Sequence, residues 1–228
     1  MAKKTKVKKP VGTSGVTRIS RNAAGHETDF QKVEFPSQKE LIEAEIVMGF
    51  VASAREILPQ LSAPAFEQNE QDDFDFNLLL ADGTKKHLEI KEIAPLMRGP
   101  YDAAAASYMV YDFATLIRKM ILKQSARYKG STGSGLYLLL YVTDWRFRLS
   151  PSVVTLLCYW ALRNPHCFQR IYVYQVRERR EGFAGIIYPE AVPTGFDPES
   201  LRHNRVQNAD PTKMRELPCG GIGWKFDD

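Results

Sequence analysis

Two acidic residues and one lysine lie near the ends of a short segment, residues 74–93, which reads FDFNLLLADGTKKHLEIKEI. Asp75 is near its start, and Glu89 and Lys91 are near its end. Carboxylate oxygens are the ligands that Mg²⁺ prefers. A lysine ammonium does not bind a metal, but it can orient a water molecule or neutralise charge that develops on a phosphate. These residue types suit metal-assisted hydrolysis of a phosphate ester, provided that the fold brings them together.

A β-hairpin within this segment decides whether they meet. Alternate residues of a strand share a face, so Glu89 and Lys91 lie on the same side. Asp75 joins them if it pairs with Glu89, which leaves residues 81–83 as a three-residue loop with its glycine at the left-handed position. A two-residue turn would instead pair Asp75 with Ile90 and direct the two carboxylates to opposite faces. We expect the three-residue loop.

The flanking residues predict the elements around this hairpin. A helix is expected over residues 37–58, beginning with a capping-box pattern at Ser37, and a polar connection over residues 60–72. A long helix is expected over residues 101–129, with four residues facing the core, namely Met109, Phe113, Leu116 and Met120. The apolar run GLYLLLYVTDW predicts a central strand that is buried on both faces.

The second half of the chain continues this alternation. Ser150 and Pro151 are typical of a helix start, and Asn164-Pro165 of its end. The stretches FQRIYVYQV and FAGIIYP predict two further strands. The expected fold class is α/β, with a mixed central sheet flanked by helices on both faces.

Composition indicates a single domain with extensions. The chain has 228 residues, of which 44% are hydrophobic, enough for a proper core. We expect a basic, flexible N-terminal arm over residues 1–34, the folded domain over 35–192, and an irregular extension over 193–228. No apolar stretch is long enough to span a membrane, so we expect a cytoplasmic protein. The three cysteines, Cys158, Cys167 and Cys219, suit reduced thiols.

The charge distribution indicates a polyanionic partner. The net charge is only +4, but five lysines lie within the first nine residues. A flexible basic arm gains free energy on nucleic acid by releasing counterions. A solubilising tail has the same composition, so both interpretations stay open.

A third acid is expected from the first helix. At 100° per residue, Glu43 lies on the same stripe as the apolar Ile46 and Phe50, whereas Glu45 lies on the opposite side. A carboxylate on a core-facing stripe requires a cationic partner, either a metal or a basic side chain. Glu43 is therefore our choice, and Glu40, on the flank of this stripe, is the competing candidate.

Asp75, followed by Glu89-Ile90-Lys91 as E-x-K on the next strand, resembles the pattern of the PD-(D/E)XK nuclease superfamily. The resemblance covers residues 37–176 and implies a restriction-endonuclease-like fold with an αβββαβ core. It implies that Mg²⁺ or Mn²⁺ binds to Asp75, Glu89 and the backbone carbonyl of Ile90, while Lys91 assists the attacking water. A further acid often comes from the first helix of such proteins. Phe74 stands where the name of the superfamily has a proline.

The long helix carries candidate contacts to nucleic acid. Lys119, Lys123 and Gln124 lie where they could reach a phosphate backbone, and Arg146 follows the central strand beside Trp145. Gln124 and Tyr128 also fit a Q-x-x-x-Y pattern found in one branch of the same superfamily. Because this pattern falls at the end of a helix, we interpret it as a coincidence.

The hypothesis from the sequence is a magnesium-dependent DNA endonuclease with Asp75, Glu89, Lys91 and Glu43 in its site. A homodimer or a partner protein in a DNA-processing complex is compatible with this activity. The first alternative is a nucleic-acid-binding or assembly module that has the same fold and does not cleave. The second is a small-molecule or interaction domain in which the E-x-K residues form an ordinary strand face.

Overall fold

The computed structural model describes residues 12–22, 25–55, 57, 66–69, 74–94, 106–128, 135–216 and 222–224. The helices are α1 (Lys39–Ser53), α2 (Val110–Arg127) and α3 (Pro151–Arg163). The strands of the main sheet are β3 (Phe66–Gln68), β4 (Phe76–Leu79), β5 (Lys85–Glu92), β7 (Leu136–Val142), β8 (Arg170–Glu178) and β9 (Glu181–Tyr188). The smaller strands are β1 (Gly15–Asn22), β2 (Gly25–Lys32), β6 (Ser107–Met109), β10 (Arg205–Gln207), β11 (Met214–Glu216) and β12 (Ile222–Trp224).

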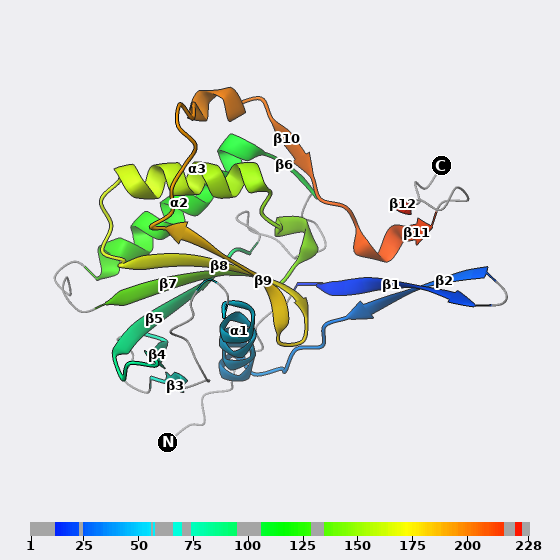
Figure 1. Ribbon diagram of the computed structural model, residues 1–228, viewed down its shortest axis with the longest axis horizontal. Coiled ribbons are helices and arrows are strands. Elements are labelled where there is room, and N and C mark those ends of the chain that lie inside the picture. The colour runs from blue at the N-terminus through cyan, green and yellow to red at the C-terminus, as the bar shows by residue number, and fades with distance from the viewer. Residues whose placement is uncertain are drawn as a thin grey trace, which may run out of the picture.

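The main sheet is mixed and has the strand order β3-β4-β5-β7-β8-β9. Strands β5, β7 and β8 are parallel, whereas β3-β4-β5 form an antiparallel meander and β9 runs antiparallel to β8. Helix α1 covers one face, and α2 and α3 cover the other (Figure 1). The predicted α/β class with a mixed sheet between helices is therefore confirmed. Strand β3 lies within the expected polar connection, where no strand was predicted from the residues.

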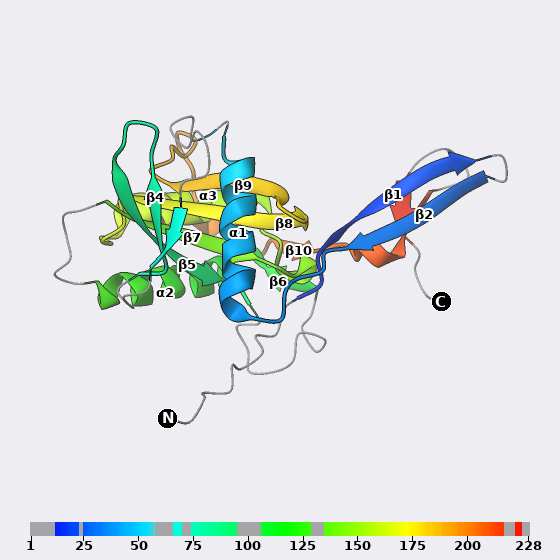
Figure 2. The same cartoon turned by 90° about the horizontal axis from the view of Figure 1, so that it is seen from below.

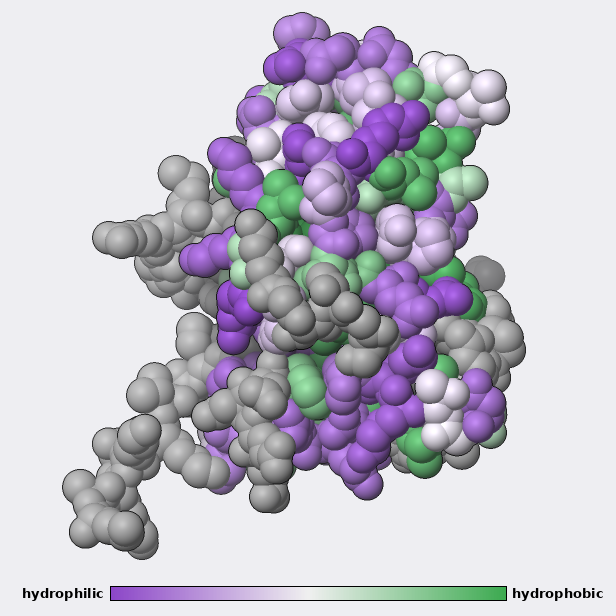
Figure 3. Space-filling model, turned by 90° about the vertical axis from the view of Figure 1, so that its left-hand side faces the viewer, coloured by the Kyte–Doolittle hydropathy of each residue, from purple (hydrophilic) through white to green (hydrophobic). Residues whose placement is uncertain are grey.

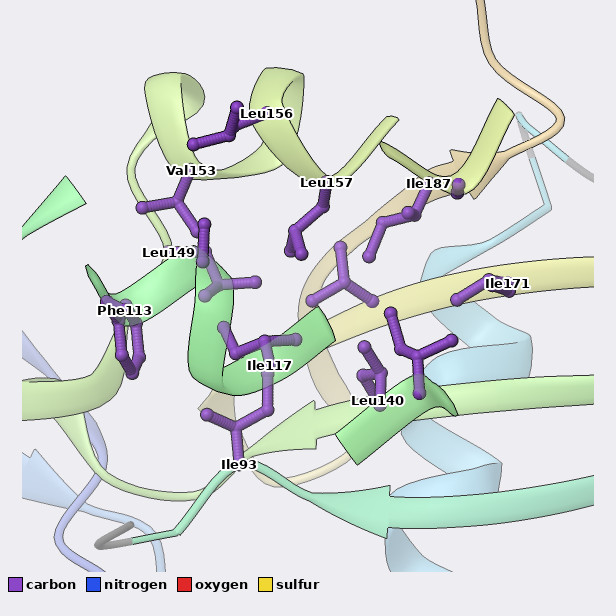
Figure 4. Close-up of a cluster of buried hydrophobic side chains, with 14 of the residues drawn as sticks. Ile93, Phe113, Ile117, Leu140, Leu149, Val153, Leu156, Leu157, Ile171 and Ile187 are labelled. Atoms are coloured by element: carbon purple, nitrogen blue, oxygen red, sulfur yellow. The ribbon is translucent and has the colours of Figure 1, made fainter. Parts of the chain in front are cut away.

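Strand β7 is the central strand because its side chains are apolar on both faces. Leu139 and Tyr141 pack in the core beneath α1, while Leu138 and Leu140 pack against α2 and α3. In the second core, Leu140 lies close to Ile117 of α2 and to side chains of α3 (Figure 4). The prediction of a strand buried on both faces is confirmed.

The first and last turns of α3 agree with the sequence. The Ser150 hydroxyl accepts a hydrogen bond from the N–H of Val153, Pro151 occupies the first turn, and Asn164 caps the end. Helix α1 differs from the expectation because Ser37 does not cap it; the helix starts at Lys39 after Gln38, whose side chain makes no capping hydrogen bond. It ends at Ser53, and Leu58, its expected end, lies outside the described residues.

Helix α2 also differs from the expectation. It begins only at Val110, because residues 107–109 form a strand that pairs with residues 205–207. Residues 101–105 and 129 lie outside the described part of the chain. Of the predicted core stripe, Phe113 is buried and Met120 is partly buried against the core. Leu116 is 39% exposed, and Met109 lies in β6, before the helix. The buried stripe has the helical spacing of three and four residues and comprises Val110, Phe113, Ala114, Ile117, Ile121, Gln124 and Ser125.

The expectation of a flexible arm up to residue 34 was wrong for its second half. Strands β1 and β2 form an antiparallel hairpin that extends away from the main sheet (Figure 2). Its residues are mostly polar, and for this reason hydrophobic periodicity did not reveal it. The lysine-rich residues 1–11 lie outside the described residues.

The expectation of an irregular extension after residue 193 was wrong in part. Strand β10 pairs with β6, and β11 pairs with β12 beside the N-terminal hairpin (Figure 1). Cys158 and Cys167 are free thiols, and Cys219 lies outside the described residues. None of the described helices is both long and apolar enough to cross a membrane.

Candidate functional site

The β4–β5 hairpin has the register that brings the acidic residues to one place. Phe76 pairs with Leu88, which is the pairing that the three-residue loop requires. Gly83, the last residue of that loop, has a left-handed φ of 80°. The predicted loop is confirmed, and the alternative two-residue turn is excluded.

Asp75 lies immediately before β4 and contacts the middle of the E-x-K sequence. Its Oδ2 accepts a hydrogen bond of 2.8 Å from the backbone N–H of Ile90. Strand β4 begins only at Phe76, so no residue of β4 lies opposite Ile90. The Asp75 carboxylate accepts the hydrogen bond from the Ile90 N–H that a backbone carbonyl of β4 would otherwise accept. The N–H and C=O of one strand residue point to the same side of the strand, so the Ile90 carbonyl also points to the side on which Asp75 lies.

Glu89 is 4% exposed and turns towards the end of α2. Its Oε1 accepts hydrogen bonds from the Gln124 amide and, at 3.2 Å, from Nη1 of Arg127. Its Oε2 accepts a hydrogen bond of 2.5 Å from the Tyr128 hydroxyl. A buried carboxylate is costly unless it is paired, and these three donors meet that requirement.

Gln124 and Tyr128, the two residues that fit the Q-x-x-x-Y pattern, share one partner, Glu89. Residues four apart lie on the same side of a helix, and Gln124 continues the buried stripe of α2 at its polar end. The sequence reasoning missed Tyr128 and Arg127 as part of the site. The continuation of the buried stripe to Gln124 was the signal that could have found them.

Opposing effects act on the pKa of Glu89, and the net shift is upward. Burial raises this pKa most, and the nearby negative charge of Asp75 raises it further. Hydrogen bonds from Tyr128 and Gln124 and the charge of Arg127 lower it. Burial and the contact with Glu89 also raise the pKa of Tyr128, which keeps its hydroxyl a donor. Asp75 therefore lies near enough to Glu89 for its negative charge to act on this carboxyl.

Helix α1 contributes a buried acid, as the helical phase predicted. Glu43 is 7% exposed and pairs with Lys39 at 3.5 Å. Glu40 is exposed. Glu45 lies elsewhere, with its oxygens bound to Arg179 and Arg180. The ranking of Glu43 as the core-facing acid is confirmed, and its possession of a basic partner was one of the two outcomes expected for it.

Glu43, Asp75 and Glu89 line one cleft of about 620 Å³ between α1, the end of β5 and the end of α2. Lys91 is exposed there, on the same strand face as Glu89. The charged residues of the cleft are Lys39, Glu40, Glu43, Asp75, Glu89, Lys91, Glu92 and Arg127. All four residues expected to be catalytic, and Ile90, therefore lie in one cleft.

The donor atoms of the cleft suit a hard divalent cation. Asp75, Glu89 and the Ile90 carbonyl are oxygen donors, as Mg²⁺ and Mn²⁺ prefer. Within the described ranges, no three acidic, histidine or cysteine side chains form a metal cluster. The candidate metal ligands are therefore the Asp75 and Glu89 carboxylates and the main-chain oxygen of Ile90, and Glu43 lines the same cleft.

No family model, curated protein or solved structure matches this chain.

Of the four candidate DNA contacts, two are exposed and two are bound to other side chains of the protein. Lys119 and Lys123 are exposed on α2, outside the residues that line the cleft. Gln124 is 5% exposed and bound to Glu89, so the expectation that it reaches a phosphate was wrong. The Arg146 guanidinium binds both oxygens of Asp144, at 2.8 and 2.9 Å, and only 11% of its side chain is exposed. We therefore retain Lys119 and Lys123 alone.

Proposed function

We propose that the protein is a metal-dependent nuclease that hydrolyses phosphodiester bonds in DNA, with a restriction-endonuclease-like fold. The observation that carries this proposal is the hairpin register, which joins Asp75 to the E-x-K strand in one cleft. Apart from the short β6, which pairs with β10 outside the main sheet, the order is α1, β3, β4, β5, α2 and β7, with β7 parallel to β5. This order supports an αβββαβ core.

Asp75, Glu89 and the Ile90 carbonyl would hold Mg²⁺ or Mn²⁺, with Glu43 as a further acid. A metal held there would supply a Lewis acid that activates water for attack. Gln124 and Tyr128 hold the Glu89 carboxylate in one orientation, through contacts that are buried. The water oxygen would bond to phosphorus as one P–O ester bond breaks, the water giving a proton to solvent and the released sugar oxygen taking one up. The Lys91 ammonium would orient that water or offset the charge on the phosphate.

A cleavage assay tests this proposal. Linear, nicked, branched and single-stranded DNA are incubated with the protein in Mg²⁺ or Mn²⁺, with EDTA as the metal-free control. We expect cleavage that is lost in EDTA and in Lys91→Ala. Lys85→Ala is the matched control, because Lys85 is an exposed lysine on the same face of β5 and lies outside the cleft lining. Equal cleavage by the Lys91 and Lys85 variants would refute the role of Lys91.

A second candidate function is a nucleic-acid-binding or assembly module that does not cleave. One observation favours it: three protein donors already satisfy both oxygens of Glu89. Such a module would bind DNA with an affinity that falls steeply with salt, and Mg²⁺ would yield no product on any substrate. The surface in Figure 3 is largely hydrophilic, with hydrophobic residues in separate small patches.

A further inference from the structure

The ion pair between Arg127 and Glu89 joins two residues with very different surroundings. The Glu89 side chain is 6% exposed, whereas that of Arg127 is 57% exposed. Arg127 lies in the last turn of α2 and lines the cleft. Its guanidinium therefore faces both the buried acid and the solvent at the cleft.

Arg127 uses little of its hydrogen-bonding capacity on Glu89. A guanidinium has five N–H donors in a planar fork, and one of its nitrogen atoms, Nη1, makes the contact, at 3.2 Å. Gln124 and Tyr128, the other two donors to Glu89, are 5% and 9% exposed, so they are fixed by burial. Of the three contacts, the one from Arg127 is the one that can be exchanged without exposing buried groups.

The cleft has more acidic than basic side chains. Its lining contains five carboxylates, Glu40, Glu43, Asp75, Glu89 and Glu92, and three cations, Lys39, Lys91 and Arg127. An acidic cleft repels a phosphodiester backbone, so substrate binding depends on the few cations present. Lys39 is paired with Glu43, and Lys91 has its own role in the proposed reaction.

We propose that Arg127 binds a backbone phosphate of the nucleic acid next to the cleaved bond and exchanges Glu89 for this phosphate when a divalent cation binds. The inference rests on the proposed function. In the free protein, the guanidinium offsets the charge of Glu89. A cation on Glu89 takes over that task, and the planar fork of Arg127 then suits two phosphate oxygens. Arg127 thereby links metal binding to substrate binding.

DNA binding without cleavage tests this exchange, with the Lys91→Ala protein as the parent. The affinity for a short fluorescent duplex DNA is measured by anisotropy over a KCl series, in Mg²⁺ and in EDTA. In Mg²⁺, Arg127→Gln should weaken binding on the order of fivefold and lower the slope of log affinity against log salt by about one. In EDTA, the loss should be smaller, because Glu89 then holds the guanidinium.

Arg163→Gln is the matched control, because Arg163 is also an exposed arginine in the last turn of a helix, and it lies outside the cleft lining. It should leave the slope unchanged. Arg127→Lys keeps the charge and should retain the slope while losing part of the affinity. Thermal unfolding of each variant verifies that it is folded.

Metal binding without DNA gives a second readout. Calorimetric titration with Mn²⁺ should show tighter binding to Arg127→Gln than to the parent, because the competing positive charge at Glu89 is gone. A purely structural role of Arg127 would weaken metal binding instead. An unchanged salt slope in Arg127→Gln, with DNA bound by the parent, would overturn this inference alone; a wild-type protein that neither binds DNA in EDTA nor cleaves it in Mg²⁺ would overturn the proposed function with it.

Discussion

The hydroxyl of Tyr128, at the end of α2, donates a hydrogen bond of 2.5 Å to Oε2 of Glu89, in β5. This contact ties the second half of the E-x-K strand to a helix that lies 39 residues later in the chain. Because Glu89 is buried, the hydrogen bond both stabilises the protein and fixes the direction of a proposed metal ligand.

Tyr128→Phe removes only this hydroxyl and should destabilise the protein. A hydrogen bond to a buried charged group contributes about 2 kcal/mol, so we expect a loss of that order in the free energy of unfolding in urea. Tyr111→Phe is the matched control, since the Tyr111 hydroxyl bonds to Glu199 at an exposed site, at 3.2 Å. Its loss should be below about 1 kcal/mol. Equal losses would contradict the role of burial.

The raised pKa of Glu89 should make stability depend on pH. Because the folded pKa lies above the unfolded value, the folded state binds the proton more tightly. The contribution of Glu89 to stability is therefore fully present below pH 4.5 and is lost as pH rises through the folded pKa.

Glu89→Gln reveals this contribution, because glutamine stays neutral at every pH. Urea unfolding of both proteins in EDTA should show the wild type losing stability relative to Glu89→Gln as pH rises from 4.5. The difference should level off above the folded pKa. A difference that does not change with pH would show that the pKa of Glu89 is the same in both states.

Glu43→Gln tests whether the buried acid of α1 takes part in the proposed reaction. We expect the Mg²⁺ concentration for half-maximal cleavage to rise on the order of tenfold. Glu45→Gln is the control on the same helix, because Glu45 pairs with Arg179 and Arg180 instead of lining the cleft. If Glu40→Gln alone raised the Mg²⁺ requirement, the third acid would be Glu40.

The left-handed conformation of Gly83 should matter because it sets the hairpin register. A Cβ at this position meets no atom within 4 Å, so Gly83→Ala acts through the backbone alone. Its φ of 80° should cost an alanine about 1 kcal/mol of stability in urea unfolding. Gly83→Asn should recover part of this loss, because asparagine tolerates the left-handed region. An alanine variant as stable as the wild type would mean that the loop rearranges.

The register of the β4–β5 hairpin could be predicted because it depends on neighbouring residues. The conformation that Gly83 permits determines the loop, and the loop determines which residues pair. The helix start at Ser150 and Pro151 could be predicted for the same reason. The ranking of Glu43 above Glu45 needed only the rotation per residue of a helix.

The partners of Glu89 could not be predicted in this way. Gln124 and Tyr128 are 35 and 39 residues away, and their contact depends on how α2 rotates and ends on the sheet. The expected stripe included Phe113 and Met120, which do pack on the core, but also Leu116, which is exposed. Likewise, β6 and β10 exist only as a pair between segments about a hundred residues apart, so neither segment shows a strand by itself.

The sequence by itself determined the three helices and the longer strands of the main sheet, the hairpin loop and the acids that share its face, because backbone periodicity and turn conformation act over a few residues. Only the tertiary structure decided which donors hold Glu89, that Arg127 stands at the cleft and that Arg146 is bound to Asp144. Those contacts arise from the packing of distant elements, where small rotations of a helix change which side chains meet.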